Sequence, residues 1–206
     1  MEHYYPKHGQ PQQTTCIRDL WQASRTKQIL LDYGSAPWVT GAYIIKTPNG
    51  MDKLSGVIEC IEVFRKHDLI DMASRWQQEG SLQKAWEELV THYFMGPFMA
   101  YEVITDLSHT PVLSGASDIY SWANAGPGAK RGCNRILGRD KDHPISQPEC
   151  NRIMRALLDK SWDWGWNGTK PWPRWTMREV EHTLCEWDKY ERARLGQGRP
   201  RGVYPH

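Results

Sequence analysis

Residues 176–196 read TMREVEHTLCEWDKYERARLG and carry the clearest helical pattern of this 206-residue chain. Thr176 is a favourable N-cap residue, and Gly196 is the residue type that most often ends a helix. A buried stripe is predicted by three apolar residues at helical spacing, Val180, Leu184 and Trp187. The stretch therefore predicts one long amphipathic helix that packs its apolar side against other elements.

Helical patterning also runs through most of the remaining chain, in segments that start at capping residues or prolines. The expected helices span 16–32, 51–65, 68–78, 81–94, 97–107, 118–125, 129–137, 147–161 and 176–195. Gly34 is expected to end the first of them in a left-handed conformation. At most a small strand or hairpin is expected at 38–45. The sequence thus predicts a mainly α fold with a single compact helical catalytic domain at 16–196, a loose segment at 1–15 and a basic arm at 197–206.

Charge is distributed unevenly along the chain. The net charge is only +2, but residues 1–129 carry −4 and residues 130–206 carry +6. A basic C-terminal third indicates an anionic partner such as nucleic acid, a nucleotide or pyrophosphate, with a solvated surface as the alternative. The 11 Trp residues suit stacking on bases as well as core packing.

Cysteine spacing and hydropathy exclude several classes of protein. The five cysteines are odd in number and form no CxxC pair, which argues against a disulfide framework or a zinc site. No signal peptide opens the chain, and no apolar run approaches the roughly 20 residues of a membrane span. We therefore expect a soluble cytoplasmic protein that uses no metal, no cofactor and no membrane.

Residues 117–139 combine two short expected helices with a Gly-Pro-Gly turn and a run of basic side chains. This is the layout of a helix-hairpin-helix element, so the fold is DNA-glycosylase-like by analogy. In such elements, backbone N–H groups at a helix N-terminus approach a phosphate. A plain helix–helix turn is the alternative. The phosphate-binding candidates are Gly126, Gly128, Lys130, Arg131, Asn134, Arg135 and Arg139.

Two carboxylates, Glu102 and Asp106, lie four residues apart in the helix expected at 97–107 and therefore share a face. Because the neighbouring residues are apolar, both carboxylates are expected to be partly enclosed. Enclosed carboxylates either pair with Arg or Lys or act as acid–base groups with a shifted pKa. Both interpretations stay open.

The last predicted helix carries many reactive side chains beside its apolar stripe. A surface histidine or a core cysteine is common by itself, but the combination indicates a functional face. These side chains are Glu181, His182, Cys185, Glu186, Asp188, Lys189 and Arg192. Beyond the helix, Arg199 and Arg201 are expected to follow a DNA backbone or to belong to a disordered end. A tryptophan-rich loop follows the helix expected at 147–161, with the sequence Trp162-Asp163-Trp164-Gly165-Trp166. Its tryptophans either stack on an extruded base or only anchor an irregular loop.

Several motifs together resemble the phage thymidine-hypermodification family. They are Gly96-Pro97-Phe98 with Asp106, Gly126-Pro127-Gly128 with Arg131-Gly132 and Asn134-Arg135, Glu181-His182 with Leu184-Cys185-Glu186, Asp188-Lys189-Tyr190 and Arg192, and Gly198-Arg199-Pro200-Arg201. This family of bacteriophage proteins includes the helical domain of 5-hydroxymethyldeoxyuridine DNA kinases and the amino acid:DNA transferases, also called glutamyl/putrescinyl-thymine pyrophosphorylases. The resemblance covers residues 91–204, and the preceding ninety residues match loosely.

Within this family the sequence favours the transferase. A kinase usually needs a P-loop of the form GxxxxGK[ST], which the sequence lacks, and no room for a separate kinase domain is expected. The resemblance then implies that the amine of a free amino acid displaces pyrophosphate from 5-pyrophosphoryloxymethyl-deoxyuridine. The implied partner is double-stranded DNA carrying this modified thymine, with pyrophosphate as a product, in the cytoplasm of the host cell if the protein is phage-encoded.

The implied chemistry suggests roles for the candidate residues. The leaving pyrophosphate needs positive charge, for which the candidates are Lys130, Arg131 and Arg135. The attacking amine needs a base, for which the candidates are Asp106, Glu181 and His182. Arg192, with Tyr190 beside it, is expected to bind the carboxylate of the amino acid. Cys185 is expected to pack, and its addition to ring carbon six of uracil is the less favoured hypothesis.

Two other functions stay open. One is a non-catalytic DNA-binding helical module that serves a separately encoded kinase. The other is a base-excising glycosylase, which would place a catalytic Asp a short helix beyond the hairpin. Asp140 and Asp142 follow the hairpin here, but in a loop-like setting.

Overall fold

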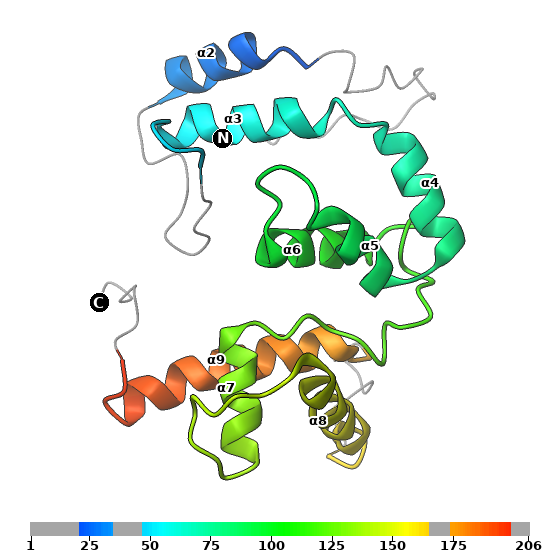
Figure 1. The fold of residues 1–206 in the computed structure, drawn as a ribbon, viewed down its shortest axis with the longest axis vertical. Coiled ribbons are helices and arrows are strands. Elements are labelled where there is room, and N and C mark those ends of the chain that lie inside the picture. Colours follow the sequence, from blue (N-terminus) through cyan, green and yellow to red (C-terminus); the bar gives the residue numbers. More distant parts are fainter. Residues whose placement is uncertain (1–20, 35–46, 165–173, 199–206) are drawn as a thin grey trace, which may run out of the picture. The chain divides into compact units, whose positions relative to one another are not determined.

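The computed structural model describes residues 21–34, 47–164 and 174–198. These residues form eight helices and no strand (Figure 1), which confirms the mainly α fold class. The chain divides into two compact units, residues 1–67 and 68–206. The segments predicted at 1–15 and 38–45 lie outside the described residues, so the expected domain boundaries stay a prediction. None of the described helices is both long and apolar enough to cross a membrane.

The first unit contains helices α2 (Ala23–Tyr33) and α3 (Lys53–Phe64), which pack against each other. Asp52 caps α3, because its side chain accepts a hydrogen bond from the Ser55 N–H at 3.0 Å. The lysine Nζ of Lys27 donates to Ser55 Oγ at 2.7 Å and joins the two helices. The left-handed stop expected at Gly34 is wrong, since its φ of 175° is extended backbone.

The second unit contains the remaining six helices. They are α4 (Leu69–Glu79), α5 (Leu82–Leu89), α6 (Pro97–Leu107), α7 (Pro127–Ile136), α8 (Gln147–Ser161) and α9 (Met177–Arg194). Local capping sets most of their starts, and the best case is the capping box that Thr176 and Glu179 form at α9. The expected bounds of α6 and α8 are confirmed. The helix end expected before Gly196 is confirmed, and Gly196 follows α9 with a φ of 65°, in the left-handed conformation.

The helix expected at 118–125 is wrong, because these residues form turns followed by irregular chain. Asp118 instead caps α5, where its carboxylate accepts from the N–H groups of Leu82 at 2.8 Å and Gln83 at 3.0 Å. The Ala123 N–H donates to Asn151 on α8 at 3.3 Å. These tertiary contacts hold the segment in a non-helical conformation, so the expected helix-hairpin-helix element lacks its first helix.

Helix α7 crosses α9 at close range (Figure 1), and two glycines on α7 make this approach possible. A Cβ on Gly128 would lie 2.5 Å from Cys185 Sγ, and a Cβ on Gly132 would lie 2.9 Å from the carbonyl oxygen of Leu184. Gly128 therefore lies inside α7 and packs against α9. The expected Gly-Pro-Gly turn is instead the start of the helix, with Gly126 as N-cap.

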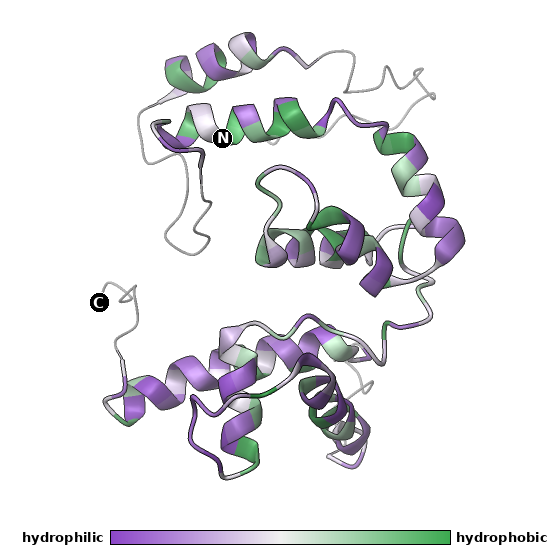
Figure 2. Cartoon of the chain, viewed as in Figure 1, coloured by the Kyte–Doolittle hydropathy of each residue, from purple (hydrophilic) through white to green (hydrophobic). Residues whose placement is uncertain are grey.

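Helix α9 is mostly hydrophilic along its length (Figure 2), so few apolar side chains are available to bury. Its buried residues are Met177, Val180, Glu181, Leu184 and Asp188. Two of these five residues are acidic. The packing of α9 therefore depends on how these two carboxylates are compensated.

Candidate functional site

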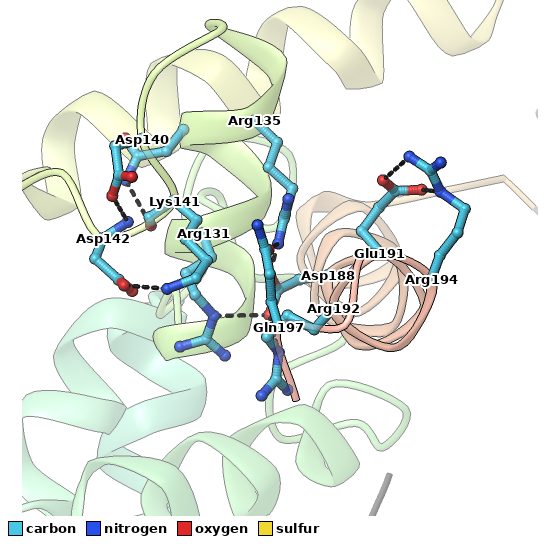
Figure 3. Close-up of polar contacts among 11 residues, drawn as sticks. Arg131, Arg135, Asp140, Lys141, Asp142, Asp188, Glu191, Arg192, Arg194 and Gln197 are labelled. Atoms are coloured by element: carbon cyan, nitrogen blue, oxygen red, sulfur yellow. Dashed lines mark hydrogen bonds and ion pairs between the residues drawn. The ribbon is translucent and has the colours of Figure 1, made fainter. Parts of the chain in front are cut away.

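Asp188 is fully buried and is surrounded by three arginines. Arg131 and Arg135 extend from α7, and Arg192 lies one turn further along α9 (Figure 3). The Nε groups of Arg131 and Arg192 donate to Asp188 Oδ2 at 2.7 and 3.1 Å, and the Nε of Arg135 donates to Oδ1 at 3.2 Å. We call these four residues the Asp188 cluster.

The Asp188 cluster has an excess of positive charge, since three guanidinium groups face one carboxylate. Each guanidinium has five N–H donors, and a carboxylate offers about four acceptor positions. Gln197 takes one further donor, because its Oε1 accepts from Arg135 Nη2 at 2.7 Å. The arginine side chains stay partly open to solvent, with 12 to 32% of their surface exposed. The cluster is therefore suited to bind an anion.

An ion pair between Lys141 and Asp142 lies beside the Asp188 cluster (Figure 3). The hydrogen bond from Lys141 lowers the pKa of Asp142, and the positive charges of Arg131 and Arg135 lower it further. Because Lys141 and Asp142 neutralise each other, they leave the positive excess of the cluster in place.

The sequence identified the three arginines as substrate-binding candidates and placed Asp188 on the same functional face, but it assigned no chemical role to Asp188. A signal was present in the spacing. Asp188 lies seven residues after Glu181 and four before Arg192, so all three share a helix face, and an Asp–Arg pair at this spacing is favourable.

Glu181 is the second buried carboxylate of α9, with 5% of its surface exposed. Its Oε1 accepts a hydrogen bond from the backbone N–H of Gly126 at 3.2 Å, at the N-terminus of α7. Burial raises the pKa of Glu181 to about 7, although the hydrogen bond from Gly126 acts in the opposite direction; the nearby charge of Glu102 raises it further. A carboxyl group with this pKa exchanges protons near neutral pH.

His182 lies between two carboxylates. Its Nε2 is 3.8 Å from Glu181 Oε2 and 3.7 Å from Glu102 Oε1 on α6. We call these three residues the Glu181 group. The structure therefore brings together three of the predicted acid–base candidates, and His182, which is 38% exposed, connects the buried carboxyl group to solvent.

Cys185 lies between Glu181 and the Asp188 cluster, with its sulfur packed against Gly128. Burial raises the pKa of the Cys185 thiol, and the charge of Glu181 raises it further. Since the thiolate is the nucleophilic form, a raised pKa disfavours attack on a uracil ring. This arrangement favours the packing role over the covalent one.

Asp106 does not share the enclosure of Glu102, so this expectation is wrong. The Asp106 side chain is exposed, because the buried side of α6 consists of Ala100, Tyr101, Ile104 and Thr105 and Asp106 points away from it. The predicted face of α9 is also divided. Glu186 and Lys189 pair with each other at its exposed side, and Tyr190 is 63% exposed.

Two phosphate-binding candidates have other partners. Asn134 is buried, and its amide donates to the carbonyl oxygens of Lys141 at 3.1 Å and His143 at 2.8 Å, which fixes the loop after α7. Arg139 donates to Glu149 Oε1 on α8 at 2.8 Å. Lys130 is half-buried on α7.

Some predicted features are not part of either group. Asp140 and Asp142, considered for a glycosylase, are exposed in a turn. Arg199, Arg201 and Trp166 lie outside the described residues. Within the described ranges, no group of three His, Cys, Asp or Glu side chains is arranged to hold a metal ion.

Comparison with curated proteins and with solved structures gave no match. A family model described as the helical domain of 5-hmdU DNA kinase matches residues 10–199. The match includes both the Asp188 cluster and the Glu181 group, and it confirms the relation to this domain that the sequence motifs indicated. The chain therefore belongs to the family of the 5-hmdU DNA kinase helical domain.

Proposed function

We propose that this chain acts in thymidine hypermodification of DNA, as a transferase. In this proposal, the amine of a free amino acid displaces pyrophosphate from 5-pyrophosphoryloxymethyl-deoxyuridine in double-stranded DNA. The family supports the link to modified thymine. The observation that carries the proposal is the Asp188 cluster, because its surplus guanidinium donors suit a pyrophosphate.

The reaction forms one bond and breaks another at the methylene carbon on the ring. A C–N bond forms to the amine, the C–O bond breaks, and its electron pair leaves with the pyrophosphate. Negative charge therefore grows on the leaving group during the reaction. Guanidinium donors that are already held in place by Asp188 would stabilise this charge without having to reorganise.

The attacking amine must also lose a proton. The Glu181 carboxylate suits this role, because a general base acts best when its pKa lies near the working pH. His182 would then pass the proton to solvent. Glu181 and Asp188 are seven residues apart, or roughly 10 Å along the axis of α9, which leaves space for the leaving group at one end and the amine at the other.

The experiment that tests this proposal uses duplex DNA carrying 5-pyrophosphoryloxymethyl-deoxyuridine together with mixed amino acids. Nucleosides are analysed by mass spectrometry after digestion. We expect an aminoacyl thymidine from the native protein and a loss of about 10²-fold in rate for Arg135→Gln. Arg139→Gln is the matched control, since Arg139 pairs with Glu149 instead, and it should retain native activity. No new nucleoside from the native protein would contradict the transferase.

The second candidate is a non-catalytic DNA-binding module that serves a separate kinase. One observation favours it: Glu181 and Asp188 both have partners on α7, so both could serve only to hold α7 against α9. Such a module would bind DNA and form no product. A glycosylase would produce abasic sites, but the missing first helix of the hairpin element removes the observation that suggested it.

A further inference from the structure

An apolar cavity of about 170 Å³, open to solvent at Trp164 and Ile136, lies among α7, α8 and α9. Three tryptophans line it, Trp164, Trp175 and Trp187, together with aliphatic side chains that include Ile136 and Leu184. Neither the Asp188 cluster nor the Glu181 group contributes to its lining.

The size and lining of the cavity suit one flat ring. An engineered protein cavity of about 150 Å³ with an apolar lining binds benzene. The indole rings of tryptophan offer flat faces on which bases stack, and this stacking tolerates any base. Because the lining is apolar, the cavity would hold a ring by its faces and would not read its hydrogen-bonding edge.

Two lining residues are sequence neighbours of the Asp188 cluster. Trp187 directly precedes Asp188 on α9, and Ile136 directly follows Arg135 on α7. Leu184, which contributes to the lining, also packs against Gly132 at the crossing of the two helices. Consecutive residues of a helix lie on adjacent faces, so the cavity lies on the face of α9 beside the one that carries Asp188.

We propose that this cavity takes up a pyrimidine base extruded from duplex DNA. The inference rests on the proposed function, since an enzyme that does chemistry on a base must first take it out of the helix. The cavity and the Asp188 cluster then divide the recognition. The tryptophans hold the ring by stacking, independently of the hydrogen-bonding groups on its edge. The arginines select the base that carries pyrophosphate.

Two neighbouring residues allow a matched test. Ile136 and Leu137 are at the end of α7 with 47 and 42% of their surface exposed, but only Ile136 lines the cavity. Ile136→Trp should fill the cavity, and Leu137→Trp should leave it open. Thr183→Phe, at an exposed position of the lining, fills it independently if Ile136→Trp does not fold.

The probe is a duplex with one 5-hydroxymethyluracil next to 2-aminopurine, whose fluorescence rises when its neighbour leaves the stack. The native protein and Leu137→Trp should raise this fluorescence equally. The filled variants should reduce the population of extruded base at least about fivefold, the lower end of what one stacked base contributes. Binding to DNA, measured by anisotropy, should change little because the arginines are intact.

The outcomes separate the two proposals. An unchanged fluorescence rise in both filled variants, or native binding to DNA with no rise, would overturn the cavity proposal. The transferase is judged by the nucleoside assay on the same proteins. A native protein that extrudes the base and forms no aminoacyl thymidine supports the cavity and contradicts the transferase. If the native protein forms the product and both filled variants are as active as Leu137→Trp, the result supports the transferase and contradicts the cavity proposal.

Discussion

Glu181 and Asp188 are both buried carboxylates on the same side of α9, and both face α7, yet their surroundings differ. Asp188 is met by three guanidinium groups, whereas the Glu181 carboxylate accepts one backbone N–H. Because its charge is fully compensated, the Asp188 carboxylate holds the three guanidinium groups in place. Burial, opposed by this single hydrogen bond, leaves Glu181 with a pKa of about 7. The same helix pair therefore builds an anion-binding cluster at one end and a proton-exchanging group at the other.

The largest effect is expected from Asp188→Asn. This change removes the negative charge that holds three guanidinium groups together, and breaking a buried ion pair costs about 3–5 kcal/mol. The free energy of unfolding in urea measures the effect. Asp159→Asn is the control, because its pair with Arg155 is exposed and such pairs contribute about 0–1 kcal/mol. An equal loss in the free energy of unfolding for the two variants would show that the Asp188 cluster is not formed.

The next effect concerns Glu181 and pH. Its pKa is about 7 in the folded protein and 4.5 as the ordinary value, so the folded state holds the proton more tightly. The protonated Glu181 therefore contributes about 3 kcal/mol to the free energy of unfolding below pH 4.5. This contribution is lost as the pH rises through 7.

Glu181→Gln should remove this pH-dependent loss, because an amide does not titrate. The free energy of unfolding, measured from about pH 5 to about pH 8, should fall steadily for the native protein and less for the variant. Glu186→Gln is the control on the exposed side of α9 and should keep the native slope. A native slope in Glu181→Gln would mean that Glu181 is not the titrating group.

Gly128→Ala tests the helix crossing that supports both carboxylates. Its Cβ would lie 2.5 Å from Cys185 Sγ, and such overpacking costs about 1–3 kcal/mol. Gly115→Ala is the control, because a Cβ there meets nothing within 4 Å and the change should stay within about 0.5 kcal/mol. Thermal unfolding compares the two. A Gly128→Ala protein as stable as Gly115→Ala would place α7 further from α9.

The smallest effect is expected from Cys185→Ser. Because the thiol is packed and its pKa is raised, we expect the transfer rate to change by less than about twofold and stability to fall by about 1 kcal/mol or less. The nucleoside assay and urea unfolding check both values. A folded Cys185→Ser protein without turnover would instead support covalent addition to the uracil ring.

The sequence determined those features that depend on neighbours along the chain. The bounds of α6, α8 and α9 follow from caps and from prolines at first helical positions, which act within a single turn. The arginines of the Asp188 cluster could be predicted as anion-binding groups because their charge is a property of the residue type. The family relation was also visible in the motifs.

Only the tertiary structure decided what each motif does. The residues at 118–125 do not form a helix, because Asp118 caps a helix that starts 36 residues earlier. Asp106 and Glu102 share a helix but not an environment, since the packing of α6 buries only one side of it. Gly128 and Gly132 turned out to be contact points with α9. Burial raises the pKa of Glu181, and two of the three guanidinium groups around Asp188 come from α7. Spacing along one helix does not specify the groups that another helix supplies.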